Sequence, residues 1–264
     1  MTTFTWTVRY EALMAARRRS VWMTVLPLAL LTLLLSASSP TVTAHSDAAA
    51  RTGTAAVLVN TFCALGIGIA LADRFRQVLD RRGMPELLSA TPGAPLARTT
   101  GALVGPLLTT LGPVAVLYLL YAATVAALSG SLAPLGSGVV ALLLAVLPAT
   151  ALAAALGGLL GVLMPVAVAR GVLAVVWLWA CHFPPSFSPV PTATGTLLSP
   201  LGGYPLVAWA HAPAVWASRE STGALRPDAD GTTALLNLAF VVTAALTCHV
   251  LGHLVTRIRR HGAS

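Results

Sequence analysis

The chain has 264 residues, of which 56% are hydrophobic and only 9% are charged, and its formal net charge at pH 7 is +8. Soluble domains usually carry about 25% charged residues, so this composition excludes an ordinary water-facing surface. The apolar residues form long runs rich in Leu, Ala and Val without strict alternation, which argues against a β-barrel and predicts an all-α integral membrane protein. The basic residues are all arginines between apolar runs, which argues against nucleic acid as a partner.

The N-terminal residues 4–20 are too polar to cross a bilayer. Trp6, Tyr10 and Leu13 recur at helical spacing in this segment, so we expect an interfacial amphipathic helix that lies along the cytoplasmic leaflet. Three arginines and an apolar run follow, a combination also found in signal peptides. The run is long and several further apolar runs succeed it, so we interpret it as the first membrane span.

Charge-free runs predict six membrane-spanning helices, since about 20 apolar residues cross a bilayer. A turn-rich stretch divides the third span from the fourth, and Met164-Pro165 ends the fourth. The fifth span follows this break directly, whereas the sixth comes after a long segment rich in proline and glycine. The six spans are expected at residues 21–36, 54–72, 103–128, 139–164, 166–183 and 233–255.

The loop between the second and third spans, residues 73–98, has the densest charge in the chain. Gly83 is suited to end a helical continuation of the second span. Pro85 suits the first turn of a new short helix, Glu86 lies near the positive end of that helix, and Pro92 stops it. A short rigid helix that projects from the membrane is suited to docking in a groove of a cytoplasmic partner.

Residues 192–217 are apolar but interrupted by proline and glycine, so no single helix can cross the membrane there. We expect two short helices, near Thr192–Leu201 and Tyr204–Ala217, that dip into the outer leaflet and return. Broken helices at membrane depth are tolerated where protein or a water-filled cavity pairs their backbone groups. An apolar loop on the membrane surface is the alternative.

The arginines are distributed unevenly between the two sides of the membrane. The side that holds both termini and the loop 73–98 carries most of them, whereas the opposite side carries only Arg51, Arg219 and Arg226. By the positive-inside rule both termini are therefore expected in the cytoplasm. We expect a multi-pass protein of the bacterial plasma membrane, in contact with membrane lipids.

The loop sequence Asp80-Arg81-Arg82-Gly83, followed by Glu86-Leu87-Leu88-Ser89-Ala90-Thr91-Pro92, resembles the ABC-2 type transporter permease family. The corresponding loop of that family reads roughly E-R-x-x-G-T-x-E-x-L-L-x-T-P, so this chain departs from it at Met84-Pro85. The layout of an entry helix, six spans and a re-entrant pair before the last span is also similar. The resemblance implies a coupling helix that docks on an ATPase subunit through Arg82, Gly83, Pro85, Glu86, Leu87, Leu88, Thr91 and Pro92.

The same resemblance implies a permease subunit of a type V-like ABC exporter. The chain contains no G-x-x-x-x-G-K-[S/T] motif and no lysine, so ATP and Mg²⁺ would be bound by a separate ATPase subunit, present in two copies. No cofactor or catalytic residue is expected in this chain. A second permease, identical or related, would complete a path lined largely by the second and fifth spans. The cargo would be hydrophobic or amphipathic, such as a drug, a lipid or an antimicrobial peptide.

Other residue patterns leave other functions open. Gly157 and Gly161 form a small-residue face that permits close helix packing. His249 and His253 share a helical face but lack a third metal ligand, so a metal site is not expected. An ion-coupled secondary carrier and a non-catalytic membrane scaffold remain alternatives. An intramembrane enzyme ranks last, since the fourth span has no serine nucleophile.

Overall fold

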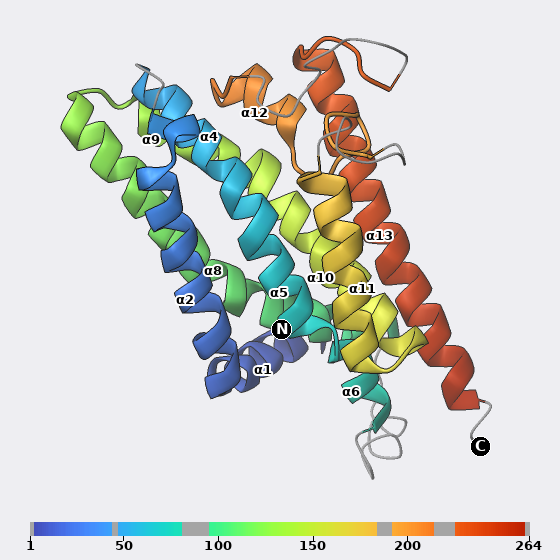
Figure 1. Cartoon of the computed structure of the whole chain (residues 1–264). Helices are drawn as coiled ribbons and strands as arrows, with labels where there is room; N and C mark the ends of the chain where they lie inside the picture. Colours follow the sequence, from blue (N-terminus) through green and yellow to red (C-terminus); the bar gives the residue numbers. More distant parts are fainter. Residues whose placement is uncertain (1–2, 44–46, 81–94, 184–191, 214–224, 262–264) are drawn as a thin grey trace.

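The computed structural model describes residues 3–43, 47–80, 95–183, 192–213 and 225–261 (Figure 1). Within these ranges the chain forms helices, turns and irregular segments, and no strand occurs. Four helices are long and apolar enough to cross a membrane, namely Ala48–Gln77, Leu96–Ser129, Ala133–Leu163 and Gly231–Arg259. The expectation of an all-α protein with several membrane-spanning helices is therefore confirmed for these residues. Two shorter apolar helices, Trp22–Ser38 and Val166–Cys181, coincide with the expected first and fifth spans.

The N-terminal half of the chain begins with a helix that lies across the lower end of the bundle and continues with two long helical segments (Figure 1). The second segment contains a π-helical turn at Val59–Cys63, and a turn at its lower end leads into a last short helix. The helices of this half are α1 (Thr3–Ala16), α2 (Arg19–Ser38), α3 (Pro40–Thr43), α4 (Ala48–Leu58), α5 (Ala64–Leu71) and α6 (Arg74–Asp80).

The C-terminal half contains the longest helices. A π-helical turn at Leu142–Val146 lies within the expected fourth span. Residues 192–202 form turns, and a short helix beside them sits on the end of the bundle opposite α1 (Figure 1). The helices of this half are α8 (Pro95–Ser129), α9 (Ala133–Ala141), α10 (Leu147–Leu163), α11 (Val166–Cys181), α12 (Gly203–Trp209) and α13 (Gly231–His261).

Several elements differ from the sequence-based expectations. The helix of the third span begins at Pro95, inside the expected loop. The helix of the fourth span begins at Ala133 rather than at residue 139, because Pro134 is tolerated in a first helical turn. The expected short helix at Thr192–Leu201 is wrong, since this stretch forms turns. Its residues are mainly Thr, Ser, Gly and Pro, whose side chains or backbone preferences favour turns. The expected second short helix is seen as α12 up to Trp209, and residues 214–217 lie outside the described ranges.

The core of the bundle is built from small residues. Ala55 and Ala64 on the second long helix and Ala149 and Ala153 on the fourth are fully buried. Small side chains let helices approach closely, and this close contact is a main source of helix association in lipid. Helices α5 and α10, which carry Ala64, Ala149 and Ala153, lie at the centre of the bundle (Figure 1).

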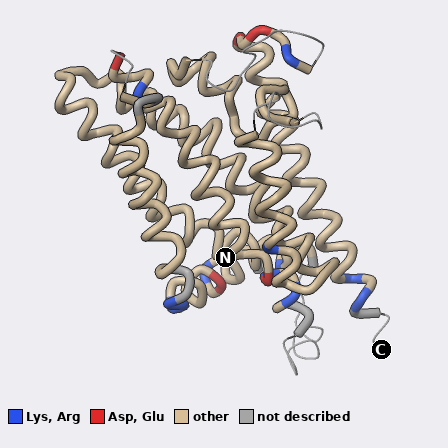
Figure 2. Tube along the Cα trace, in the orientation of Figure 1, with Lys and Arg blue, Asp and Glu red and all other residues tan. Residues whose placement is uncertain are grey.

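The charged residues of the described ranges lie at the two ends of the bundle, and a charge-free zone separates them (Figure 2). One end holds α1, α6 and the C-terminal end of α13, and arginine predominates there. The opposite end holds few charges, among them Asp47, Arg51 and Asp230. We refer to these two ends as the Arg-rich end and the Arg-poor end. This separation fits a protein that crosses a membrane, with water-facing surfaces at both ends.

Candidate functional site

The predicted docking residues Arg82–Pro92 lie outside the described residues. The two helices that lead into and out of them are described, and both have these ends at the Arg-rich end of the bundle (Figures 1 and 2). Helix α6 ends at Asp80, and α8 begins at Pro95. The site is therefore built from the residues that hold the base of this loop, which we call the junction: Glu11, Arg18, Asp73, Arg74, Phe75 and Gln77.

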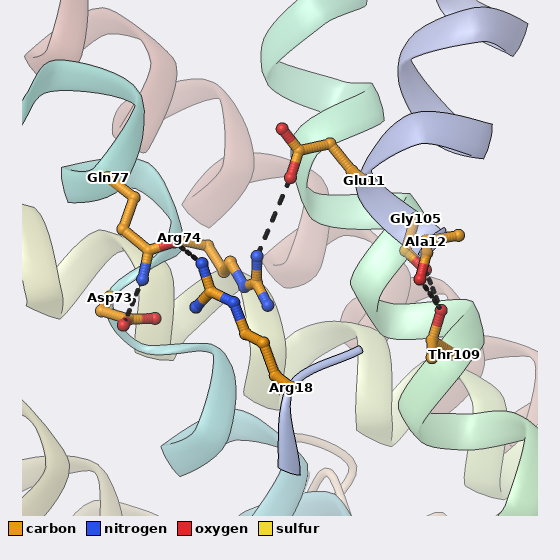
Figure 3. Close-up of polar contacts among 8 residues, drawn as sticks. All are labelled: Glu11, Ala12, Arg18, Asp73, Arg74, Gln77, Gly105 and Thr109. Atoms are coloured by element: carbon orange, nitrogen blue, oxygen red, sulfur yellow. Dashed lines mark hydrogen bonds and ion pairs between the residues drawn. The ribbon is translucent and has the colours of Figure 1, made fainter. Parts of the chain in front are cut away.

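A buried ion pair lies at the centre of the junction. The Arg74 Nη1 atom is 3.8 Å from Glu11 Oε2, and the two side chains are only 3% and 5% exposed (Figure 3). Removing two charges from water is costly, and the cost is recovered only when each charge has a partner. Since Glu11 belongs to α1 and Arg74 to α6, the pair joins the entry helix to the base of the loop.

A second polar chain runs beside this ion pair. Arg18 donates from Nη2 to Gln77 Oε1 at 3.0 Å, and Gln77 in turn donates from Nε2 to Asp73 Oδ2 (Figure 3). Arg18 lies in the link between α1 and α2, whereas Asp73 and Gln77 flank Arg74 on either side. The segment that leads into the loop is thus attached to the N-terminal segment at two points.

Helix α1 is in turn packed directly on α8. Thr109 on α8 donates from Oγ1 to the Ala12 carbonyl oxygen at 3.2 Å (Figure 3). A Cβ at Gly101 would lie 2.8 Å from the Thr7 side chain, and one at Gly105 would lie 2.6 Å from the Val8 carbonyl oxygen. No side chain fits at either position, so the two glycines allow α1 to lie against the helix that leaves the loop.

Phe75 connects the junction to the interior of the bundle. Its side chain is completely buried, and its ring centroid lies 5.6 Å from that of His249 on α13. A Cβ at Gly158 on α10 would meet the ring at 3.0 Å, and a Cβ at Gly252 on α13 would overlap it. The aromatic ring therefore occupies a slot between α10 and α13 that only glycine leaves open.

The two histidines of α13 each lie within hydrogen-bond distance of a threonine of α8. His249 Nε2 lies 2.9 Å from Thr100 Oγ1, and His253 Nδ1 lies 3.0 Å from Thr99 Oγ1. These contacts tie α13 to the first turns of α8. Among the described residues no group of three His, Cys, Asp or Glu side chains could hold a metal ion.

Gly157 and Gly161 of α10 lie against α5. A Cβ at Gly157 would be 2.6 Å from the Gly68 carbonyl oxygen, and a Cβ at Gly161 would overlap the Ala72 carbonyl oxygen. The contact is made within the chain, and it lies directly before the turn that leads into α6. The cysteines Cys63, Cys181 and Cys248 form no disulfide with one another.

Two asparagines hold the segment at the Arg-poor end, and sequence reasoning missed both. Asn60 donates from Nδ2 to the Leu201 carbonyl oxygen at 2.8 Å. Asn237 donates to the carbonyl oxygens of Leu197 and Ser199 at 2.7 and 3.0 Å. Both side chains are buried. They pair backbone groups of the turns at 197–201 that have no regular helix to pair them.

The π-helical turn and a glycine complete this arrangement. A π-turn leaves one backbone carbonyl without its regular partner, and the Asn60 carbonyl oxygen accepts from Trp177 Nε1 at 3.2 Å. Gly202 has φ +73°, and a Cβ there would lie 2.7 Å from the Ala145 side chain. Both features lie where the turn segment contacts the second and fourth long helices.

Comparison of the chain with protein-family models, with curated proteins and with solved structures finds no match in any of the three. The ABC-2 resemblance therefore rests on the loop motif and on the layout of the helices. The residues of the junction that sequence reasoning missed include Glu11, Arg74 and Phe75. A local signal exists for one of them, because Glu11 is the sole acidic residue before Asp47.

Proposed function

We propose that the chain is the permease subunit of an ABC-2 type, ATP-driven exporter in a bacterial plasma membrane, with both termini in the cytoplasm. The observation that carries the proposal is the match of residues 80–92 to the coupling-loop motif of that family. The position of the neighbouring helices supports it, since α6 and α8 border this loop at the Arg-rich end (Figure 2). ATP and Mg²⁺ are bound by a partner ATPase in two copies, and a second permease completes the pathway.

The junction offers a route by which a displacement of the loop can reach the membrane-spanning helices. A helix docked on an ATPase transmits a displacement only if its base is rigidly attached to the spans. Here the base is attached to α1 through Glu11–Arg74 and to α10 and α13 through Phe75. Movement of the loop therefore reaches the entry helix, the fourth span and the last span together.

The chemistry of the chain favours a hydrophobic or amphipathic cargo, such as a drug, a lipid or an antimicrobial peptide. The middle of the bundle carries no charge among the described residues (Figure 2). An ion-coupled carrier usually keeps ionisable residues at membrane depth. His249 and His253 on α13 are the exceptions, and each lies within hydrogen-bond distance of a threonine of α8. The scarcity of other ionisable residues in the spans favours energy supplied by a partner over an ion gradient.

The test is co-purification from mild detergent after co-expression with the neighbouring genes, with bound proteins identified by mass spectrometry. We expect an ATPase subunit to accompany the wild-type chain. Glu86→Arg is expected to reduce the bound ATPase about tenfold or more, because a reversed charge in a docking interface is strongly unfavourable. Asp228→Arg, a charge reversal at the exposed Arg-poor end, is the matched control and should retain the ATPase.

Two results would contradict the proposal in different ways. Full retention of the ATPase by the Glu86→Arg variant would exclude this loop as the docking element. Isolation of the wild-type chain without any ATPase would remove the main support for an exporter and favour a carrier or a scaffold.

A further inference from the structure

One face of helix α1 is covered by protein, whereas the other face is apolar and exposed. Ala15 and Glu11 are buried, and the same side of the helix meets α8. The other face carries Trp6, Tyr10 and Leu13, which recur at the spacing of one helical face and are 55%, 50% and 52% exposed. An exposed stripe of large apolar side chains of this kind marks a surface that contacts something other than water.

Arginines border this exposed stripe. Arg9 and Arg17 are exposed, and the Arg9 guanidinium carbon lies 5.8 Å from the centre of the Trp6 ring. Arg9 therefore lies over the face of the indole ring in a cation–π contact, which keeps a positive charge beside the apolar stripe. The helix carries one acidic residue, Glu11, and that side chain is buried on the opposite face with Arg74. The exposed face is therefore uniformly basic.

We propose that the exposed face of α1, formed by Trp6, Arg9, Tyr10 and Leu13, together with Arg17 directly after the helix, is a docking surface for the headgroups of anionic phospholipids. The aromatic side chains enter the interfacial layer, and the arginines pair with the phosphate and acidic headgroups around them. A second copy of this chain is a poor occupant, because a two-fold contact through this face would bring the same arginines together. The inference does not depend on the transport proposal.

The binding of lipid to this face is transmitted to the rest of the molecule. The opposite face of α1 is tied to α8 by Thr109 and to α6 by the Glu11–Arg74 pair (Figure 3). A ligand that binds the folded state and not the unfolded state stabilises the folded state, by an amount that grows with the ratio of ligand concentration to Kd. Anionic lipid is therefore expected to raise the thermal stability of the whole chain.

The experiment uses the full chain in vesicles that contain phosphatidylcholine and phosphatidylglycerol in equal parts. In one preparation only the phosphatidylglycerol is brominated, and in the other only the phosphatidylcholine. Tryptophan fluorescence is measured for the wild type and for Trp6→Phe, and the difference gives the quenching of Trp6. We expect brominated phosphatidylglycerol to quench Trp6 more strongly than brominated phosphatidylcholine.

Arginine variants test the charge. Arg9→Gln with Arg17→Gln should reduce the preference for phosphatidylglycerol, by roughly fivefold for each arginine removed. Arg9→Lys with Arg17→Lys should keep it. The matched control is Arg257→Gln with Arg259→Gln, which removes two exposed arginines from α13 at the same end of the bundle. This control should leave the quenching of Trp6 unchanged.

A thermal measurement completes the test. Replacing phosphatidylcholine by phosphatidylglycerol should raise the melting temperature of the wild type and of the α13 control, but not that of the glutamine variant of α1. Equal quenching of Trp6 by the two lipids would show an interfacial helix without headgroup preference and would overturn the proposal. Quenching by neither lipid would show that this face does not contact the membrane and would overturn the proposal as well.

Discussion

Glu11 and Arg74 place opposite charges in a part of the molecule that excludes water. Each side chain alone would carry a large desolvation cost, so the two charges stabilise the fold only as a pair. Arg76, two residues further along α6, is exposed and provides a comparison on the same helix. The difference between these two arginines that the comparison uses is therefore one of burial, not of side-chain chemistry.

Arg74→Ala is expected to lower the free energy of unfolding by about 3–5 kcal/mol, since it leaves Glu11 buried without its cation. Arg76→Ala should change it by less than about 0.5 kcal/mol, as is usual for an exposed site. Reversible unfolding in mixed micelles, with a rising fraction of a denaturing detergent, gives both free energies. The double variant Glu11→Ala with Arg74→Ala should lose less than the sum of the two single variants. Equal effects of the two arginine variants, or strict additivity, would contradict the ion pair.

Close helix packing is tested at two glycines that lie in different surroundings. A Cβ at Gly161 of α10 would overlap the Ala72 carbonyl oxygen, whereas a Cβ at Gly171 of α11 would meet no atom within 4 Å. Alanine at an exposed helical position is favoured over glycine by about 1 kcal/mol. The same glycine-to-alanine substitution is therefore expected to lower the stability at Gly161 but not at Gly171.

Gly161→Ala should lower the melting temperature, because α5 and α10 must separate to admit the methyl group. Gly171→Ala should leave it unchanged or raise it. Both are measured in the same detergent and at the same protein concentration. A Gly161→Ala variant as stable as the wild type would show that Gly161 does not pack directly against the backbone at Ala72.

The start of α13 shows how far local sequence specifies a helix. The Asp230 side chain accepts from the Thr233 amide at 2.7 Å, and the Thr233 hydroxyl lies 2.9 Å from the Asp230 amide. The hydrogen bond from the Thr233 amide is the main reason that the pKa of Asp230 lies below its usual range, and the Thr233 side chain adds to this effect. The pattern of an acid followed three residues later by threonine ahead of an apolar run could be read from the sequence as a helix start.

Other elements could be predicted only in part. Charge-free runs located the apolar helices because lipid leaves few alternatives to a helix. The turns at 192–202 were mistaken for a helix, since their stability comes from Asn60 and Asn237, which are distant in sequence. These are the two asparagines of the chain, each within an apolar run, so polarity at membrane depth was an available signal. The partner of Glu11 could not be predicted, because no local pattern links α1 to Arg74.

At the scale of the whole molecule, α13 offers the most direct test of orientation. The helix runs from Gly231 to His261, and its spanning portion ends at Arg259. Its 31 residues extend about 46 Å at 1.5 Å per residue, which exceeds the hydrocarbon core of about 30 Å. Residues just before and at the end of this helix should therefore lie on opposite sides of the membrane.

Asp228 and Arg259 are exposed and lie at these two ends of α13. The cysteine variants Asp228→Cys and Arg259→Cys can be labelled with a thiol reagent that does not cross membranes. Cys63 and Cys181 are buried and Cys248 is half-buried in the helix, so the unmodified chain provides the background. Because arginine predominates at the end that holds Arg259 (Figure 2), we expect Asp228→Cys to react in intact cells and Arg259→Cys to react only after permeabilisation. The reverse pattern would place the Arg-rich end outside the cell, and a cytoplasmic ATPase could then not reach the loop between α6 and α8.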